Sequence, residues 1–371
     1  MVKDNTTKKN DNYCAFIHSG SYPNPRIFKN IEVCKELGYR VVYISAIRYK
    51  ALRKKEKWHG IEINRLGFYY PQSSLLCLFG NLWFNLSVFI WLINKKPELI
   101  HASDLESMFG AVAYKLIRRK VKLLFNIHDN FSLRYNIPKF IKSFLKYVEI
   151  VIGKFADAVI LPDEMRLELL KPWVPKKYFI IYNSPLDPGY NAKKLSGKLK
   201  IFASGWITWT RGFDLLYRLI NNRKDVELVI CGSGSNCIVK TIKSWPRTEF
   251  YGYLQQKESL NIGKTCDIIF CFYDPSIEIN IYAAPNKLFD ALALGRPIII
   301  NEEIKVARIV KENKVGFCLK YGDYKALYNL IDFILSKPEQ LLEMGQRARN
   351  LYESKYHWSK IKEVIIEAFK T

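Results

Sequence analysis

The chain has 371 residues, of which 49% are apolar and 25% are charged, as in ordinary globular proteins. This composition excludes a disordered chain and a collagen-like repeat, and the length favours two domains. Lys and Arg number 58 and Asp and Glu 35, a net charge of +23. Phosphorylated ligands, anionic membranes and nucleic acids are therefore the classes of partner that this charge would attract.

The cysteines and the N-terminus bear on the cellular compartment. The eight cysteines are scattered, with no Cys-x-x-Cys pair and no cluster at zinc spacing, so we expect buried, reduced thiols and no metal site. The first residues, MVKDNTTKKNDNY, are polar and lack the apolar stretch of a signal peptide. We therefore expect a cytoplasmic protein.

Short apolar runs alternate with helical stretches along the first half of the chain. Strands are predicted at 14–18, 41–45, 62–66, 99–101, 123–127, 158–161 and 179–182. Alternation of this kind is typical of a parallel sheet with helices on both faces.

The same alternation recurs in the second half of the chain. Strands are predicted at 200–203, 227–231, 249–251, 268–272, 297–300 and 316–319. The stretch between the halves, SPLDPGY, is rich in turn formers and reads as a linker. We therefore predict an α/β protein with two doubly wound domains, at 1–183 and 200–351, a linker at 184–199 and a terminal helix at 352–371. Ligands of such sheets sit beyond the carboxyl ends of the strands, so a phosphorylated ligand between the two domains is expected.

Two segments of the first half raise the question of a membrane. Residues 75–94 carry no charge and are mostly apolar, which suits a helix buried against a sheet, a helix partly embedded in one leaflet, or a membrane span. In residues 139–155, lysines 139, 142 and 146 fall near one helical face and most apolar residues, Phe140 and Phe144 among them, fall elsewhere. Such a helix lies in a membrane interface or forms the charged surface of an ordinary packed helix. Basic runs at 53–57 and 118–120 add positive surface, so an anionic membrane is a plausible partner of this half.

The segment 284–300, APNKLFDALALGRPIII, carries the clearest chemical signal. Pro285 and Asn286 suit a loop that enters a helix, where free backbone N–H groups bind phosphate. Lys287 adds a positive charge. Asp290 follows one turn later, where a carboxylate can accept two hydrogen bonds from a sugar diol. The alternative is a surface salt bridge between Lys287 and Asp290.

This segment resembles the donor-site motif of glycosyltransferase family 4, the retaining GT-B enzymes, in its Pro-Asn-Lys-Leu-Phe-Glu form. The match runs through Leu288 to Asp290, which is one methylene shorter than the usual Glu. The resemblance implies that Asp290 holds the ribose hydroxyls of a nucleotide sugar. Many members carry a second acid near the transferred sugar, and Tyr282 stands at that position here.

A second stretch, SGWITWTRG at 204–212, follows a predicted strand. It is similar to the family's Gly-Arg-Leu-x-x-x-Lys-Gly loop, whose two cations bind the donor diphosphate. Gly205 matches the glycine, Arg211 keeps the charge of the Lys, and Trp206 loses the charge of the Arg. We expect Lys287 to supply the missing charge.

The first half contains three looser matches. The loop HSGSYPNPR at 18–26 resembles the family's first glycine loop, in which Gly20 would face the diphosphate and the acceptor. The segment LFNIHD at 124–129 resembles the one whose His faces the donor sugar, which makes His128 the candidate nearest the reacting centre. Asp104, which ends LIHASD, and Asp129 would orient a His or bind acceptor hydroxyls.

The resemblance implies a GT-B fold with an N-terminal acceptor domain and a C-terminal nucleotide-sugar domain. It implies metal-independent, retaining transfer of a sugar from a nucleoside diphosphate to a hydroxyl of a glycan or lipid-linked acceptor, without a cofactor. The expected setting is cell-surface polysaccharide or glycolipid assembly at the inner face of the membrane.

Three alternatives stay open at this point. One is an inverting GT-B transferase. Another is an inactive sugar-nucleotide-binding relative, which the departures at Trp206, Tyr282 and Asp290 suggest. The third, a nucleic-acid-binding protein, is disfavoured because no recognised binding motif accompanies the charge.

Overall fold

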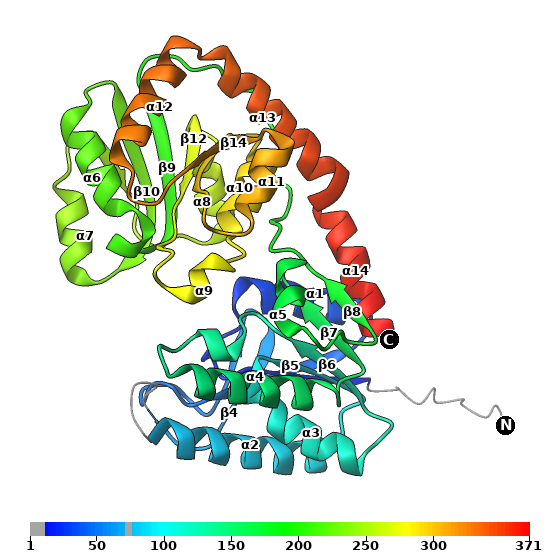
Figure 1. The fold of residues 1–371 in the computed structure, drawn as a ribbon. Coiled ribbons are helices and arrows are strands. Elements are labelled where there is room, and N and C mark those ends of the chain that lie inside the picture. Colours follow the sequence, from blue (N-terminus) through cyan, green and yellow to red (C-terminus); the bar gives the residue numbers. More distant parts are fainter. Residues whose placement is uncertain (1–11, 71–75) are drawn as a thin grey trace. The chain divides into compact units, whose positions relative to one another are not determined.

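The computed structural model describes residues 12–70 and 76–371, which form two compact units. The first unit comprises residues up to Ile181 together with Lys362–Thr371, and the second comprises Tyr182–Ile361. The polar N-terminal segment, on which the absence of a signal peptide was argued, lies outside the described residues up to Asp11, as does Leu75, the first residue of the uncharged segment. Each unit is built around a sheet covered by helices, so the predicted α/β class is confirmed (Figure 1).

The first unit contains an eight-stranded sheet in the order β3-β4-β2-β1-β5-β6-β7-β8. The strands are β1 (Tyr13–Ile17), β2 (Arg40–Ala46), β3 (Lys55–Trp58), β4 (Ile61–Leu66), β5 (Leu99–Ser103), β6 (Lys122–Asn126), β7 (Ala158–Leu161) and β8 (Tyr178–Ile180). All adjacent strands are parallel except β3, which pairs antiparallel with β4 at one edge. The sequence prediction missed β3, because its pattern of alternating charged residues looks like an exposed basic loop.

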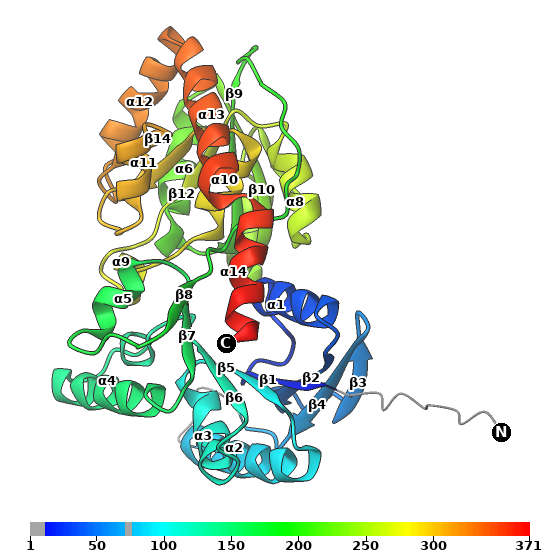
Figure 2. The same ribbon diagram turned by 90° about the vertical axis from the view of Figure 1, so that its right-hand side faces the viewer.

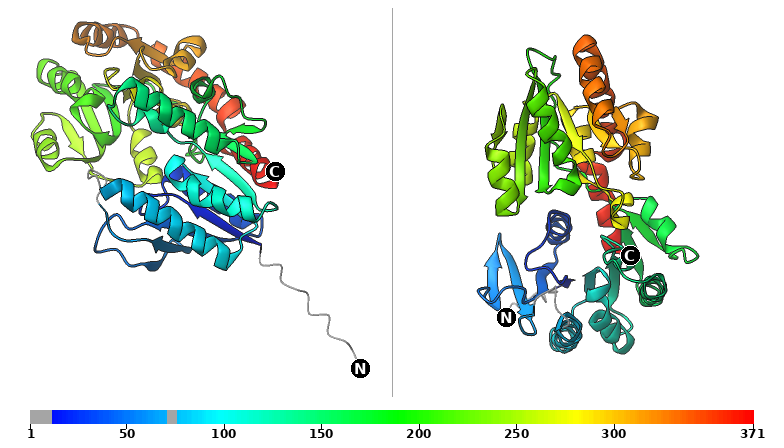
Figure 3. Two further views of the ribbon diagram at one scale, coloured as in Figure 1. Left: turned by 60° about the horizontal axis from the view of Figure 1, so that its bottom comes forward. Right: turned by 60° about the vertical axis from the view of Figure 1, so that its left-hand side comes forward.

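Helices cover both faces of this sheet. They are α1 (Pro25–Glu36), α2 (Leu76–Lys95), α3 (Met108–Ile117), α4 (Lys139–Gly153) and α5 (Met165–Leu170), with short 3-10 turns η1 (Leu105–Ser107) and η2 (Phe131–Leu133). Helices α2, α3 and α4 lie over one face, while α1 lies over the other beside the end of α14 (Trp358–Lys370) (Figures 2 and 3). Phe369 of α14 packs against Phe16 and His101 of this unit.

The second unit contains a six-stranded, wholly parallel sheet in the order β11-β10-β9-β12-β13-β14. The strands are β9 (Leu199–Ile207), β10 (Val226–Gly234), β11 (Thr248–Phe250), β12 (Ile268–Cys271), β13 (Ile298–Asn301) and β14 (Gly316–Leu319). The helices are α6 (Phe213–Asn222), α7 (Asn236–Lys243), α8 (Gln256–Gly263), α9 (Glu278–Ile281), α10 (Asn286–Leu294), α11 (Ala307–Asn313), α12 (Tyr324–Ser336) and α13 (Glu339–Leu351), with the short helices η3 (Trp209–Arg211) and η4 (Tyr352–Tyr356).

Buried aliphatic and aromatic side chains form the core between each sheet and its helices. In the first unit, Val42, Ile100 and Leu123 of the sheet pack with Phe84 and Val88 of α2. In the second unit the corresponding cluster joins β9, β10 and β12 to α6, α7 and α12. Because adjacent strands are parallel, their carboxyl ends share one edge of each sheet, where the loops carrying polar residues emerge.

The uncharged segment of the first unit forms the helix α2. None of the described helices is long and apolar enough to cross a membrane. One side of α2 is buried through Phe84, Val88 and Leu92, as expected for a helix packed on a sheet. Its other side is exposed and apolar.

In α4 the side chains of Phe140 and Phe144 are exposed, and Lys142 and Lys146 are half-buried, because the sheet-facing side of the helix carries other apolar residues. The outer face of α4 is therefore aromatic as well as basic.

The eight cysteines are free thiols, as expected, but the expectation that all of them are buried was wrong. Cys237 is exposed, since it lies in the first turn of the surface helix α7, and Cys77 and Cys318 are half-buried.

Candidate functional site

The loop that follows β9 in the second unit holds Arg211. The backbone N–H of Thr210 donates to Oγ1 of Thr208 at 3.1 Å, which caps the 3-10 turn η3 that ends at Arg211. Gly212 then takes a left-handed conformation with φ of 75° and packs so tightly that a Cβ would lie 3.0 Å from the ring of Phe270. Any other residue at Gly212 would meet both backbone strain and a steric clash, so this glycine fixes the position of Arg211 over the sheet.

Two cations meet at the ring of Tyr273, which follows β12. The guanidinium carbon of Arg211 lies 3.5 Å from the ring centroid, and Nζ of Lys287 lies 5.5 Å from the same centroid. Nη1 of Arg211 is buried and has no hydrogen-bond partner among the described residues. Two cations beside one aromatic ring form a site to which an anion would bind favourably.

The electrostatics of Lys287 reflect this crowding. Burial lowers the pKa of Lys287, and the charge of Arg211 lowers it further, while Cys271 and Asp290 act in the opposite direction. An anion placed beside Lys287 and Arg211 would offset both the desolvation and the mutual repulsion.

Glycine backbones form the floor beside Lys287. Gly205 of β9 has a φ of 97°, and a Cβ there would lie 3.8 Å from Nζ of Lys287. Gly232 of β10 pairs with Gly205, and a Cβ on Gly232 would lie 1.9 Å from the carbonyl oxygen of Gly205. Only glycine allows these two strand ends to approach so closely, and it leaves the space along Lys287 open.

Helix α10 begins at the same place. Pro285 is its N-cap residue, Asn286 is exposed and Leu288 is buried in the core. The first N–H groups of a helix have no acceptor within the helix, so this end favours an anion. One turn further on, Oδ1 of Asp290 accepts a hydrogen bond of 3.0 Å from Nε2 of Gln256, which orients the carboxylate.

Tyr273 and Asn301 are site residues that the sequence analysis missed. The side chain of Asn301 clamps the backbone of Tyr273: its Oδ1 accepts from the N–H at 2.8 Å, and its Nδ2 donates to the carbonyl oxygen at 3.1 Å. Both residues stand at the carboxyl ends of neighbouring parallel strands, β12 and β13, and that position is the signal that would have found them.

Two of the three departures from the family pattern, Trp206 and Tyr282, lie apart from each other. Trp206 lies beyond the glycine of β9 with 61% of its side chain exposed. Tyr282 is half-buried at the end of α9, and its ring centroid lies 6.0 Å from Nζ of Lys305. Thus the structure joins Arg211, Lys287 and Gly205 in one cluster, whereas Tyr282 contacts a different cation.

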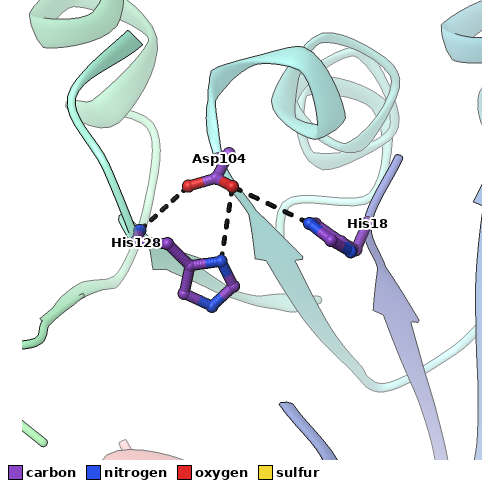
Figure 4. A group of neighbouring side chains, drawn as sticks. All are labelled: His18, Asp104 and His128. Carbon is purple, nitrogen blue, oxygen red and sulfur yellow. Dashed lines mark hydrogen bonds and ion pairs between the residues drawn. The ribbon is translucent and has the colours of Figure 1, made fainter. Parts of the chain in front are cut away.

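A second cluster lies in the first unit, where β1, β5 and β6 are neighbours. His18, Asp104 and His128 each follow one of these strands and point toward one another (Figure 4). Oδ1 of Asp104 accepts from the backbone N–H of His128 at 2.9 Å, and Oδ2 lies 3.3 Å from Nδ1 of the same ring. Oδ2 also lies 3.8 Å from Nε2 of His18. The sequence analysis did not select His18 as a site residue, although it stands at a strand end adjacent to the other two.

The groups around the two rings differ. Nδ1 of His18 lies 3.2 Å from the N–H of Gly20 and 3.0 Å from the hydroxyl of Tyr43. Nδ2 of Asn126 lies 3.0 Å from Nε2 of His128, which puts the proton of that neutral ring on Nδ1, facing Asp104. Burial, followed by the charge of His128, lowers the pKa of His18 to about 3, so His18 is neutral at physiological pH.

Gly20 is held tightly against His18. Besides its N–H contact, its carbonyl oxygen accepts from the hydroxyl of Tyr43 at 3.0 Å. A Cβ on Gly20 would lie 2.6 Å from Cε1 of His18. The close backbone approach that was predicted for Gly20 is therefore an approach to the ring of His18, two residues earlier in the chain.

Asp104 is a buried carboxylate on a strained backbone. Burial alone would raise the pKa of Asp104, but Arg134 and His128 together hold it well below its usual range. Nη2 of Arg134 lies 2.7 Å from Oδ2. The φ of Asp104 is 63° with ψ of 160°, a conformation that residues other than glycine rarely adopt. Strain of this kind clusters at functional sites, where surrounding contacts maintain it.

Asp129 takes a different partner from Asp104. Its Oδ1 accepts from Nη2 of Arg166 at 2.7 Å, and its side chain is 44% exposed. Of the three residues predicted to be catalytic, the structure therefore joins Asp104 and His128 directly and places Asp129 beside them on an arginine.

The ligand atoms of His18, Asp104 and His128 lie within 4.8 Å of one another, a spacing that a metal ion would accept. However, Arg134 already pairs with the carboxylate at 2.7 Å, and Nδ1 of His128 faces the same oxygen at 3.3 Å. The charge of Asp104 is therefore already offset by an arginine, so this donor set does not favour a cation.

Two family models match this chain. The model for glycosyl transferases group 1 matches residues 191–351, and the model for Glycosyltransferase Family 4 matches residues 31–184. The protein therefore belongs to glycosyltransferase family 4, whose members are transferases of the GT-B type, as the sequence resemblance predicted.

Similar proteins agree with this assignment. An uncharacterized glycosyltransferase of Haemophilus influenzae is 24% identical over 70% of this chain and 75% of its own length. The capsular polysaccharide biosynthesis glycosyltransferase CapM of Staphylococcus aureus is 20% identical over 83% of this chain and 86% of its own length.

Solved structures share the fold. Sucrose-phosphate synthase from Thermosynechococcus elongatus has a TM-score of 0.74 at 16% identity, covering 96% of this chain and 98% of that chain. Anabaena Alr3699/HepE, solved in complex with UDP-glucose, has a TM-score of 0.71 at 16% identity, covering 96% of this chain and 99% of its own. The predicted GT-B fold is confirmed by these structures.

Proposed function

We propose that this glycosyltransferase moves a sugar, with retention, from a nucleoside-diphosphate sugar to a hydroxyl of a glycan or lipid-linked acceptor. The observation that carries the proposal is the pair of half-buried cations, Arg211 and Lys287, beside the ring of Tyr273. A diphosphate suits such a pair, because the planar guanidinium of Arg211 can donate hydrogen bonds to two oxygens and the ammonium of Lys287 can neutralise a third.

Helix α10, which carries Lys287, would also bind the other parts of the donor. The start of α10, at Pro285 and Asn286, would direct backbone N–H groups at the phosphates. Asp290 would accept hydrogen bonds from the ribose hydroxyls. The complex of HepE with UDP-glucose supports a nucleotide sugar as the donor here.

The chemistry needs electrostatic stabilisation more than a protein nucleophile. When the sugar–phosphate bond breaks, negative charge grows on the diphosphate, where Arg211 and Lys287 would stabilise it without a metal ion. The acceptor hydroxyl would attack from the same face of the sugar, and the departing phosphate would take its proton. His128, oriented by Asp104, would contact the donor sugar, and Asp129 would bind acceptor hydroxyls.

The acceptor and the location follow from the charge of the N-terminal unit. Residues 1–188 hold 30 basic and 16 acidic side chains, which favours a phosphorylated or lipid-linked acceptor at an anionic membrane surface. We therefore place the enzyme in the cytoplasm, peripheral to the inner face of the cell membrane, in polysaccharide or glycolipid assembly. CapM, which acts in capsular polysaccharide biosynthesis, supports this setting.

A ligand screen tests the donor site. UDP-, GDP-, ADP- and CMP-sugars are compared by thermal shift and then by calorimetry, and the sugar that binds is used in a transfer assay. Arg211→Ala and Lys287→Ala should each lower turnover at least about a hundredfold, while Arg308→Ala, which removes an exposed arginine of the same unit, should not. Unchanged turnover in both site variants would refute the site. Donor binding with neither transfer nor donor hydrolysis would instead identify an inactive relative.

A further inference from the structure

The outer face of α2 is an apolar stripe. Six side chains, each three or four residues from another of the set, are at least 36% exposed, and we call them the α2 stripe: Phe79, Leu82, Trp83, Leu86, Ile90 and Ile93. No charged residue occurs in α2 before Lys95. A surface helix of a globular protein normally turns charged residues to solvent, so a continuous apolar face of this length marks a contact surface.

The orientation of the stripe is fixed by polar contacts on the buried side of α2. Nδ2 of Asn85 donates to the carbonyl oxygen of Glu106 at 2.8 Å, and its Oδ1 accepts from the N–H of Gly110 at 2.9 Å. A Cβ on Gly110 would lie 2.4 Å from the carbonyl oxygen of Asn85, so α2 and α3 pack in close contact. The helix therefore cannot rotate to bury the stripe without breaking these buried hydrogen bonds.

A basic cavity lies where α2 and α3 end. It has a volume of about 640 Å³ and five cationic lining residues against one acid, Glu98. The cations are Lys96, Arg118, Arg119, Lys120 and Lys122. Among the described residues, no carboxylate lies at ion-pair distance from the side chains of the run 118–120. Ile117, which also lines the cavity, is 60% exposed and carries the apolar surface up to its edge.

This cavity is separate from the His128 cluster. It is lined by the residues just before β5 and at the start of β6, which is the amino end of the sheet. His128 and Asp104 follow the carboxyl ends of β6 and β5. From the sequence the run 118–120 was predicted only to add positive surface, and the proposed transfer does not use it.

We propose that the α2 stripe and this cavity together dock the enzyme on an anionic bilayer, with the stripe among the acyl chains and the phosphate of a lipid headgroup in the cavity. The inference rests on the membrane partner proposed above and names its site. Guanidinium groups bind phosphate through paired hydrogen bonds, and an apolar helix face beside cations is the composition of a helix that lies in a membrane interface.

The exposed residues of helix α4 also suit an anionic bilayer. Phe140, Phe144 and Tyr147 of α4 are exposed at spacings of four and three residues, with exposed Lys139 in the first turn. Aromatic side chains beside lysine suit the headgroup level of a bilayer. Charge complementarity favours an anionic lipid over a second copy of this basic chain, because two copies would bring together like-charged cavities.

Co-flotation with vesicles tests the cationic part. The probe is phosphatidylcholine with about one third phosphatidylglycerol, compared with phosphatidylcholine alone. The triple variant Arg118→Ser, Arg119→Ser, Lys120→Ser should lose at least about tenfold in affinity, since each cation near an anionic surface contributes roughly fivefold. The matched triple variant Arg53→Ser, Lys54→Ser, Lys57→Ser removes the same charge from exposed positions at β3 and should lose much less. Equal losses in both variants would overturn the proposal.

Quenching by lipids brominated on the acyl chain tests the apolar part. Bound wild-type protein should be quenched, and Trp83→Phe, which removes the tryptophan of the stripe, should lose most of that quenching, unlike Trp245→Phe in the core of the other unit. Leu82→Ser with Ile90→Ser should weaken flotation, whereas Val174→Ser with Tyr178→Ser, also exposed, should not. Quenching that survives in Trp83→Phe would contradict insertion of the stripe.

Two controls separate this inference from the proposed function. Donor binding measured without vesicles should be unchanged in every surface variant, so a failure of flotation leaves the transferase proposal standing. Sedimentation without lipid tests a second copy as the occupant. A dimer that Leu82→Ser with Ile90→Ser converts to a monomer, with vesicle binding unchanged, would overturn the proposal.

Discussion

Asp104 contacts His128 at two points. Its Oδ1 accepts a hydrogen bond from the backbone N–H of His128 at 2.9 Å, and its Oδ2 lies 3.3 Å from Nδ1 of the ring. The first contact fixes where the chain turns after β6, and the second fixes the tautomer and plane of the ring. A carboxylate held far below its usual pKa stays ionised throughout the physiological range. It therefore acts as a permanent acceptor for His128 rather than as a proton donor.

Asp104→Asn should disable His128 without removing it. An amide in place of the carboxylate can turn its NH₂ toward the ring, which favours the wrong tautomer, and it leaves half-buried Arg134 with Glu106 as its countercharge. We expect turnover to fall about a hundredfold or more and the free energy of unfolding to fall by about 3 kcal/mol. Transfer kinetics and denaturant titration measure the two effects.

Glu106→Gln is the matched control for that variant. Glu106 is the other acid on Arg134, at 2.8 Å, but the described structure places no contact between it and the histidine rings. This variant should cost stability while leaving kcat within a few fold of the wild type. A similar loss of kcat in both variants would mean that Arg134, and not the orientation of His128, determines the rate.

The buried carboxyl group of Glu149 should make the stability of the protein depend on pH. This acid of α4 is buried and accepts hydrogen bonds from the N–H of Phe131 at 3.2 Å and from Nδ2 of Asn130 at 3.3 Å. Burial raises its pKa from 4.5 to about 7. The folded state therefore binds the proton more tightly than the unfolded state, so its contribution to stability is full below pH 4.5 and is lost as the pH rises through 7.

Glu149→Gln should remove this dependence, because glutamine keeps an acceptor for Phe131 and has no charge to bury. We compare the free energy of unfolding of the wild type with that of the variant, measured by denaturant unfolding at pH 5 and pH 8. The wild-type value minus the variant value should be about 3 kcal/mol lower at pH 8 than at pH 5. Glu168→Gln, at an exposed position of α5, should show no such change. A difference that is constant with pH would show that Glu149 is ionised in the fold at both values.

The sequence predicted the strands well because parallel strands are buried on both faces and read as apolar runs. The strand predicted at 123–127 corresponds in this way to β6, Lys122–Asn126. The sequence did not predict β3, because Lys55–Trp58 lies at the edge of the sheet and has no run of apolar residues. Nor could it predict the outer faces of α2 and α4, because periodicity separates two sides of a helix without saying which side meets the sheet.

The site residues divide in a similar way. Arg211, Lys287 and Asp290 were selected because a family pattern fixes their spacing. Tyr273 and His18 were not selected, because their roles come from partners distant in sequence: Tyr273 lies under Arg211, and His18 faces Asp104 across two strands. Strand order creates those contacts, and no local pattern encodes it.

Tyr273→Leu should weaken donor binding more than it weakens the fold. The ring is the surface that Arg211 and Lys287 share, and cation–π contacts of this kind contribute about 1 kcal/mol each. We expect the KM for the donor to rise about tenfold with a smaller change in kcat, measured by transfer kinetics and by calorimetry with the nucleoside diphosphate. Tyr217→Leu, which removes an exposed tyrosine of α6 in the same unit, should leave KM unchanged. If Tyr273→Leu lowers kcat alone, the ring acts on the reaction and not on the position of the two cations.

Chelation distinguishes cationic side chains from a metal ion as the source of charge stabilisation. If Arg211 and Lys287 neutralise the departing diphosphate, dialysis against EDTA should leave kcat and the donor KM unchanged, and added Mg²⁺ or Mn²⁺ should not raise them. Activity that is lost on chelation and restored by a divalent cation would contradict this, and His18→Ala would then show whether the cluster with Asp104 and His128 holds the ion. Because the same variant should leave a metal-independent enzyme folded and able to bind its donor, calorimetry on His18→Ala separates a lost ligand from a lost fold.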